Sequence, residues 1–236
     1  MTPSERICVA LDFPTRDEVL AMARRLGGRA GWLKVGLEAF TSAGPSLVHD
    51  VAAAGGGARV FLDLKFHDIP ATVAGAVAAA ARSGASMVNV HASGGRAMLE
   101  AAREAATRHG LERLIAVTLL TSIDAAALRE LPIAGAPDEI ALRLAALAKA
   151  CELDGVVCSA TDLPSIRREC GADFLTVVPG IRPAGADVQD QKRVATPAGA
   201  AAAGADILVI GRPITGAKDP VEALEGIVAE IERVRT

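Results

Sequence analysis

Three charged residues in the stretch 59–70 are spaced so that they could form a catalytic group. Asp63 and Lys65 interrupt an apolar run typical of a buried strand, and Asp68 follows shortly after. Strand side chains alternate between faces, so Asp63 and Lys65 should point the same way. A carboxylate and an ammonium at a strand's end would perturb each other's protonation, as catalytic groups do. A structural ion pair closing a barrel end would give the same pattern, because buried charges need partners.

Segments typical of strands and helices alternate along all 236 residues, and no composition shift or linker divides the chain. We therefore predict one α/β domain spanning residues 1–236, a single (β/α)8 TIM barrel. A doubly wound open sheet is the alternative, but no Gly-x-Gly-x-x-Gly motif follows the first strand. The strands are expected at residues 7–11, 32–36, from 59, 86–90, 114–118, 155–158, 174–178 and 207–210.

Helical sequence follows each predicted strand. A capping box starts at Thr15, and Asp219 with Pro220 should begin the last helix. The other helices are expected to continue to residue 54 after the second strand, and to cover residues 72–82, 96–109, 139–151, about 162–169 and 195–203.

Composition excludes several classes of function. The net charge is −3 without a basic tract and aromatic residues are few, which disfavours nucleic-acid binding. No apolar run is long enough to cross a bilayer, and the N-terminus lacks the apolar segment of a signal peptide. The four cysteines form no Cys-x-x-Cys pair, and Cys8 and Cys158 fall in predicted strands as small buried residues. A reducing, cytoplasmic location is expected.

Polar residues gather where the predicted strands end. In a barrel, the carboxyl ends of the strands build the active site. Two lysines, two arginines and two acids should therefore converge on one mouth of the barrel. This favours an active site, rather than a structural ion pair, at the stretch 59–70. The residues are Asp12, Lys34, Asp63, Lys65, His91, Thr121, Ser122, Arg182 and Arg212.

The ends of strands seven and eight have the composition of a phosphate site. Gly180 and Arg182 follow strand seven, and Gly211 and Arg212 follow strand eight. Glycine allows backbone N–H groups to approach an anion, and arginine binds phosphate with a planar fork. Tight turns with solvated arginines are the alternative, but two of them at the usual phosphate position of a barrel favour phosphate.

Two further expectations concern the loop at 184–192 and metals. The loop is polar without apolar periodicity and could be a surface loop or a lid, with Gln191 as its natural phosphate contact. No metal site is expected, because Lys34 and Lys65 occupy the place where a cation would bind. His49 and His109 fall in helical sequence and should be solvated.

Taken together and in order, these motifs resemble orotidine 5′-phosphate decarboxylases of the bacterial type. The resemblance covers essentially the whole chain, although Ala71 stands where members of that family commonly carry Asn. The matching segments are 10–12, 34–36, 62–70, 120–122, 179–183, 190–191 and 210–213.

The resemblance implies a metal-free and cofactor-free decarboxylation of orotidine 5′-monophosphate to UMP, the last step of de novo pyrimidine synthesis. It implies an array of Lys34, Asp63 and Lys65, completed in a homodimer by Asp68 of the partner subunit. Lys65 would stabilise the C6 carbanion and donate the proton to it.

The same resemblance assigns the binding residues. The ribose would be held by Asp12, Lys34, Thr72 and the partner's Asp68. The pyrimidine would contact Thr121 and Ser122, with Pro179 also part of the substrate site. The phosphate would be held by Gln191, Gly211 and Arg212, with Arg182 nearby.

Two alternatives stay open. One is an Mg²⁺-dependent decarboxylase of 3-keto-gulonate 6-phosphate, or the related hexulose-phosphate synthase, which resembles the chain around Asp63 and Lys65. Those enzymes carry Glu at the end of the second strand, where this chain has Lys34. The other is a barrel that binds a phosphorylated nucleotide without turning it over.

Overall fold

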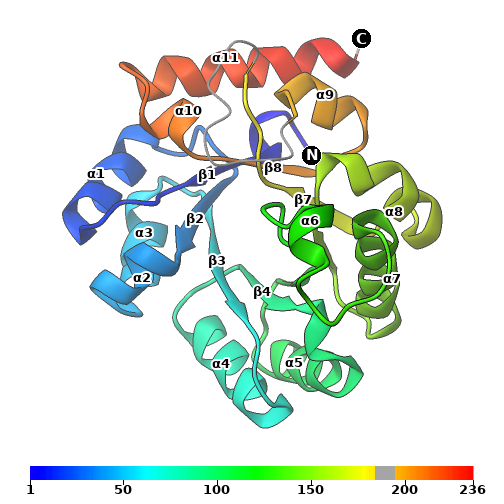
Figure 1. Ribbon diagram of the computed structural model, residues 1–236. Coiled ribbons are helices and arrows are strands. Elements are labelled where there is room, and N and C mark those ends of the chain that lie inside the picture. The colour runs from blue at the N-terminus through cyan, green and yellow to red at the C-terminus, as the bar shows by residue number, and fades with distance from the viewer. Residues whose placement is uncertain (184–194, 236) are drawn as a thin grey trace.

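The computed structural model describes residues 1–183 and 195–235, and its eight parallel strands close into a barrel in sequence order (Figure 1). Each strand pairs with the strand before it in the sequence, and β8 also pairs with β1. The prediction of one (β/α)8 barrel is therefore confirmed. The strands are β1 (Ile7–Ala10), β2 (Trp32–Gly36), β3 (Arg59–Phe66), β4 (Met87–His91), β5 (Arg113–Val117), β6 (Gly155–Val157), β7 (Leu175–Val178) and β8 (Ile207–Ile210).

Helices surround this barrel as an outer ring (Figure 1). They are α1 (Arg16–Leu26), α2 (Leu37–Ala43), α3 (Ser46–Ala54), α4 (Pro70–Arg82), α5 (Arg96–Arg108), α6 (Ala125–Leu128), α7 (Pro137–Ala150), α8 (Leu163–Cys170), α9 (Pro197–Ala202), α10 (Arg212–Thr215) and α11 (Pro220–Glu232). The two predicted caps are confirmed: Thr15 accepts from the N–H of Glu18, and Asp219 accepts from that of Val221.

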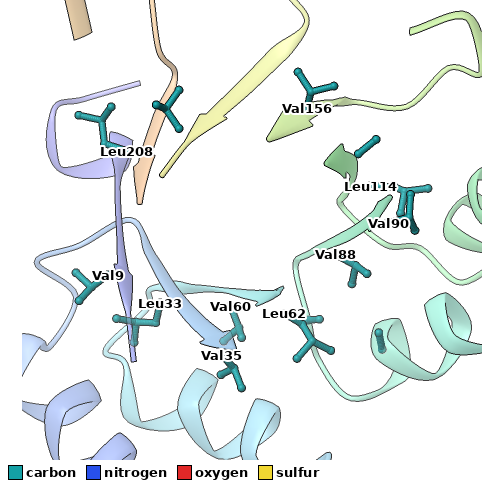
Figure 2. Packing of buried hydrophobic residues seen from close by; sticks show 14 of the residues in the cluster. Val9, Leu33, Val35, Val60, Leu62, Val88, Val90, Leu114, Val156 and Leu208 are labelled. Carbon is teal, nitrogen blue, oxygen red and sulfur yellow. The ribbon is translucent and has the colours of Figure 1, made fainter. Parts of the chain in front are cut away.

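The strands divide their side chains between two apolar cores. Outward residues such as Val9, Leu33, Val60 and Leu208 pack against the helices (Figure 2). The inward residues form a separate cluster inside the barrel, which includes Trp32. Because side chains alternate along a regular strand, these inward apolar residues indicate which residues further along the same strand also point inward. The inner cluster comprises Cys8, Ala10, Trp32, Phe61, Met87, Ile115, Val177, Ile207 and Val209.

The helical region after β2 differs from the prediction of one continuous segment to residue 54. It is divided into α2 and α3 at Gly44 and Pro45. Gly44 has φ +76°, and proline cannot continue a helix because it lacks an N–H donor. The short helices α6 and α10 were not predicted as elements, and α4 begins two residues earlier than expected, with Pro70 in its first turn.

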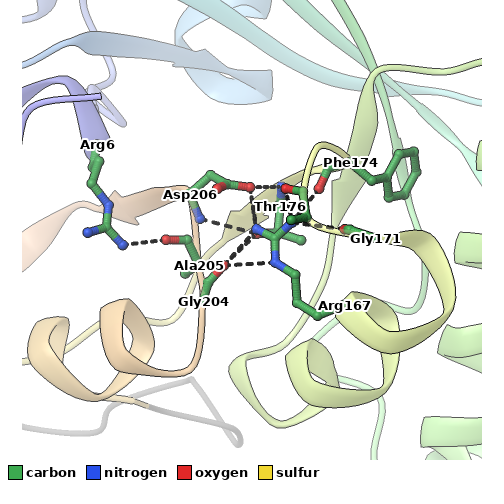
Figure 3. Close-up of polar contacts among 9 residues, drawn as sticks. Arg6, Arg167, Gly171, Phe174, Thr176, Gly204, Ala205 and Asp206 are labelled. Carbon is green, nitrogen blue, oxygen red and sulfur yellow. Dashed lines mark hydrogen bonds and ion pairs between the residues drawn. The ribbon is translucent and has the colours of Figure 1, made fainter.

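An arginine cluster joins the amino ends of β7 and β8, opposite the predicted active site (Figure 3). Arg167 donates to the carbonyl oxygens of Phe174 (2.7 Å) and Gly204, and it pairs with Asp206. Asp206 also accepts from the N–H of Thr176 at 2.7 Å. These bonds satisfy buried polar groups of two strands at once, so the cluster fixes how the strands enter the barrel.

Two other expectations can be compared with the described part of the chain. Cys8 and Cys158 are buried thiols, as predicted, and burial raises the pKa of both. None of the helices in residues 1–183 and 195–235 is both long and apolar enough to span a membrane.

Candidate active site

A cavity of about 510 Å³ opens at the carboxyl ends of the strands. It receives side chains or backbone from β1, β2, β3, β5, β6, β7 and β8 or from the loops that follow them. Most of the predicted site residues lie together in its wall. They are Asp12, Lys34, Asp63, Lys65, Thr121, Pro179, Arg182, Gly211 and Arg212.

Alternation along the strands explains why charged residues reach this cavity. In β2, Trp32 belongs to the inner apolar cluster, and Lys34 lies two residues further along. In β3, Phe61 has the same relation to Asp63. The barrel interior is therefore apolar in its lower layer and charged in the layer above, at the mouth.

The charged residues form a continuous chain of ion pairs. Lys34 Nζ lies 2.9 Å from Asp12 Oδ1 and 3.4 Å from Asp63 Oδ2. Lys65 Nζ lies 2.6 Å from the other oxygen, Asp63 Oδ1. The side chains of Lys34 and Asp63 are only 9% and 12% exposed, whereas Lys65 is 30% exposed and borders the cavity. One ammonium is thus enclosed by carboxylates, and the second is presented to a ligand.

The array keeps its buried members ionised. Burial by itself would lower the pKa of Lys34, but Asp63 and Asp12 outweigh it, so the pKa of this ammonium is raised. Burial would likewise raise the pKa of Asp63, but Lys34 and Lys65 outweigh it and hold the pKa of this carboxyl below its usual range.

The backbone at Lys65 departs from a regular strand. Lys65 has φ +53°, in the left-handed region that non-glycine residues rarely adopt. Leu62 pairs with Val88 and Phe66 with Val90, so β3 advances 66 − 62 = 4 residues while β4 advances 90 − 88 = 2. Simple alternation therefore does not describe this end of β3, although the predicted contact between Lys65 and Asp63 is present.

Asn89 is a residue of the site that the sequence analysis missed. It is fully buried in β4, donates to Asp63 Oδ1 at 2.7 Å, and accepts from the backbone N–H of Lys65 at 2.8 Å. A single amide in the middle of an apolar strand was the signal that could have revealed it, because buried polar groups need partners.

Gly36 provides the space for the Asp12–Lys34 pair. A Cβ atom built on Gly36 would lie 2.7 Å from Asp12 Oδ1 and 2.8 Å from Lys34 Nζ. These distances are shorter than van der Waals contact, so any side chain here would displace the pair. The glycine at the end of the second strand therefore leaves the pair room for its observed position.

Three predicted residues within the described part of the chain do not line this cavity, and a fourth lies outside that part. Thr72 and Ser122 are exposed and do not line it. Asp68 is also exposed, and its Oδ1 accepts from the N–H of Ile69 at 2.6 Å. Gln191, together with most of the predicted loop 184–192, lies outside the described residues.

The rest of the wall is apolar, with one added hydroxyl. Thr215 of α10 borders the cavity and was not predicted. Apolar walls with a few convergent polar groups are typical of small-molecule sites. The apolar lining residues include Val117, Leu119, Leu120, Val157 and Val209.

Two histidines lie beside the array. The rings of His67 and His91 are 5.3 Å apart, and burial followed by the charge of His67 lowers the pKa of His91. His49, in contrast, is 82% exposed, as predicted. Within residues 1–183 and 195–235, no three His, Cys, Asp or Glu side chains cluster closely enough to hold a metal ion.

The cavity has two chemically different ends. The array presents a cation held among carboxylates, which can stabilise negative charge that develops on a ligand. Arg182 and Arg212 lie in the wall after β7 and β8, with Gly180 in a left-handed conformation (φ +75°) and Gly211 beside Ala10. This end has the residue types that bind phosphate.

Comparisons with known proteins agree with this geometry. Residues 5–227 match the model of the orotidine 5′-phosphate decarboxylase / HUMPS family. The chain is 57% identical to an orotidine 5′-phosphate decarboxylase of Halorhodospira halophila (96% of this chain, 95% of the relative). It is 53% identical to the enzyme of that name from Nitrosococcus oceani (97% and 98%). A crystal structure of orotidine 5′-phosphate decarboxylase from Lactobacillus acidophilus is 37% identical, with a TM-score of 0.84 over 95% and 98% of the two chains.

Proposed function

This chain belongs to the orotidine 5′-phosphate decarboxylase / HUMPS family, and we propose that it converts orotidine 5′-monophosphate to UMP without metal or cofactor. The observation that carries the proposal is the enclosed array of Asp12, Lys34, Asp63 and Lys65 at the cavity wall. The activity places the protein in pyrimidine biosynthesis.

Lys65 is the group that acts on the reacting carbon. When the bond between C6 and the carboxylate breaks, CO2 leaves and the electron pair stays on C6. The pyrimidine ring delocalises this pair poorly, so fixed positive charge nearby must stabilise it. The Lys65 ammonium then gives a proton to C6 and becomes a neutral amine, which completes UMP.

Asp63 acts mainly through Lys65. Its carboxylate bonds Lys65 Nζ at 2.6 Å and is itself paired with Lys34 on the other oxygen. This arrangement holds the Lys65 ammonium in place before the substrate binds. Asp63 is shared by two lysines and Lys34 by two carboxylates, so the four groups act as one array.

The other end of the cavity holds the phosphate. Arg182, Gly211 and Arg212 lie in its wall, and Gln191 is proposed to join them. Thr121 and Pro179 also line the cavity, and we propose that they contact the pyrimidine together with Ser122. Phosphate contacts lie far from C6, so their binding energy can position the ring without changing the chemistry there.

The site is completed in a homodimer, in which Asp68 of each chain serves the cavity of the other and Thr72 contacts the ribose. Asp68 is exposed and does not line the cavity of its own chain. Exposed apolar side chains suitable for burial are present: Ile69, the next residue, is 67% exposed, and Leu37 at the start of α2 is 56% exposed.

Two observations favour this reaction over that of the Mg²⁺-dependent sugar-phosphate enzymes in the same family. Lys34 of β2 lies between the two carboxylates that a cation would need. Relatives at 57% and 53% identity are named orotidine 5′-phosphate decarboxylase. We place the protein in the cytoplasm, where reducing conditions keep its four cysteines as thiols.

The test is the loss of orotidine 5′-monophosphate absorbance with purified protein. We expect full turnover in EDTA and no gain on adding Mg²⁺. Turnover that EDTA abolishes and Mg²⁺ restores would favour the metal-dependent rival, and tight UMP binding without turnover would favour a binding protein.

A further inference from the structure

Asn89 is held in one orientation by groups that leave it no alternative. The backbone N–H of Lys65 can only donate, so the atom it meets at 2.8 Å must be the amide oxygen. The amide nitrogen then faces Asp63 Oδ1 at 2.7 Å, as a donor to an ionised carboxylate. Both bonds are made by a side chain with no exposure to solvent.

The bond from the Lys65 N–H to Asn89 replaces a backbone hydrogen bond that the irregular strand β3 does not make with β4. Between Leu62 and Phe66 the ladder from β3 to β4 is interrupted, and Lys65 has φ +53°. A left-handed lysine is unfavourable unless its surroundings enforce it. The Asn89 oxygen supplies the acceptor that the interrupted ladder no longer offers to the Lys65 N–H.

The same amide fixes the direction of the Asp63 carboxylate. Oδ1 of Asp63 accepts from both Asn89 and the Lys65 ammonium, while Oδ2 faces Lys34. Asn89 thus holds Lys65 at two points, directly through its backbone and indirectly through its charge partner.

We propose that Asn89 is a positioning residue for the decarboxylation, which aims the Lys65 ammonium at the substrate by bridging the Lys65 backbone and the Asp63 carboxylate. The inference rests on the proposed function, since it assigns Asn89 an effect on the step that Lys65 carries out. It goes beyond that function because the residue that orients Lys65 and Asp63 lies on β4, a strand that contributes no residue to the cavity wall.

The first test is Asn89→Ala. Misplacing a reacting group by about 1 Å can cost about 100-fold in rate, so we expect kcat to fall by about that factor. The affinity for UMP, measured by calorimetry, should stay within about threefold of wild type, because the phosphate contacts lie elsewhere. Thr118→Val is the matched control: it removes a buried hydroxyl that donates to the Val157 carbonyl and not to the array, and it should keep wild-type kcat.

The second test is Asn89→Asp, which keeps the shape but places a second carboxyl against Asp63. Two adjacent carboxylates raise the pKa of one of them, so at low pH the new acid is protonated and donates to Asp63 as the amide did. As pH rises this proton is lost, and repulsion between the two carboxylates moves Asp63 away from Lys65. The other charged or titratable groups facing this point are Lys34, Lys65 and His91.

We expect kcat of Asn89→Asp, relative to wild type at the same pH, to be highest near pH 5 and to fall about tenfold or more by pH 9. This variant also carries the test if Asn89→Ala does not fold. A ratio that is flat with pH, wild-type kcat in Asn89→Ala, or equal losses of kcat and UMP affinity would each overturn the positioning role. If wild type itself does not turn over orotidine 5′-monophosphate, the proposed function fails instead.

Discussion

Lys34 carries its charge in a place where burial alone would remove it. Its side chain is 9% exposed, yet carboxylate oxygens lie 2.9 and 3.4 Å from its Nζ and raise its pKa. The enclosed ammonium in turn helps keep Asp63 ionised, and Asp63 holds Lys65. Each charge thus helps to hold the next, and all of them border the cavity, with Lys65 more exposed than Lys34 or Asp63.

Replacing Lys65 separates chemistry from binding. We expect Lys65→Ala to lose both charge stabilisation and the proton donor, lowering kcat by about 10⁴-fold or more. UMP affinity should change far less, because the phosphate end of the cavity is untouched. Stopped assays on orotidine 5′-monophosphate and calorimetry with UMP measure the two quantities, with Lys149→Ala as an exposed lysine control away from the cavity. Near-normal kcat in Lys65→Ala would refute the role.

The lowered pKa of Asp63 predicts an acid-side loss of stability. A carboxyl whose pKa is below its ordinary 3.8 in the folded state binds protons more weakly there than when unfolded. Its contribution is therefore fully present well above pH 3.8 and is lost as pH falls through the folded pKa.

The comparison that isolates this effect is wild type against Asp63→Asn in urea unfolding at several pH values. We expect the difference in unfolding free energy to be constant above about pH 5 and to shift against wild type as the pH falls below that range. A difference that stays flat down to pH 2 would contradict an ionised Asp63 in the folded protein.

Part of the site could be predicted from single residues and part could not. Asp63 and Lys65 were recognisable because charges in an apolar strand need an explanation. The left-handed backbone of Lys65 was not, since nothing in a lysine's identity favours φ +53°. Asn89 was missed because its role depends on the register between β3 and β4, a long-range relation that local sequence does not contain.

At the scale of elements, runs of aliphatic residues predicted all eight strands, with boundaries that differ by one residue in several cases. Strands buried on both faces are uniformly apolar, so they are recognised easily. The division between α2 and α3 was missed because apolar helical sequence continues on both sides of Gly44 and Pro45. The short α10 was missed because four residues carry no periodicity.

The turn from β8 into α10 places Arg212 at the cavity, so replacing Arg212 should weaken binding of the ligand's phosphate. Losing a charged hydrogen bond lowers affinity by about 10- to 100-fold, and we expect Arg212→Ala to raise the Kd for UMP by that factor. Uridine, which lacks the phosphate, should bind both proteins alike.

The matched control for this comparison is Arg25→Ala, because Arg25 lies on α1 and pairs with Asp219 outside the cavity. Its UMP affinity should equal that of wild type. An Arg212→Ala protein that binds UMP as tightly as wild type would remove Arg212 from the phosphate site.

Across the whole molecule, stabilising polar contacts and the proposed catalytic residues lie at opposite ends of the barrel. The Arg167–Asp206 cluster fixes strands at their amino ends, whereas the charge array lies at their carboxyl ends. Asp68 stands apart from both, exposed on the loop that follows Lys65 and outside the cavity wall. We propose that the site it serves belongs to another copy of the chain, and the alternative is the cavity of its own chain.

A mixing experiment distinguishes the two arrangements. Lys65→Ala and Asp68→Ala are each expected to be nearly inactive as homodimers. In a mixed dimer with Asp68 shared across the interface, one cavity lacks both groups and the other has both intact. Random exchange of equal amounts should therefore restore about a quarter of wild-type activity, since about half the dimers are mixed and each has one intact site of two.

The alternative geometry predicts the opposite result from the same mixture. If Asp68 served the cavity of its own chain, every cavity in a mixed dimer would lack one of the two groups, and mixing would restore nothing. Exchange can be verified independently by tagging one variant and recovering the other with it. Verified exchange without recovered activity would contradict a shared site, and sedimentation showing only monomers at assay concentration would contradict the dimer itself.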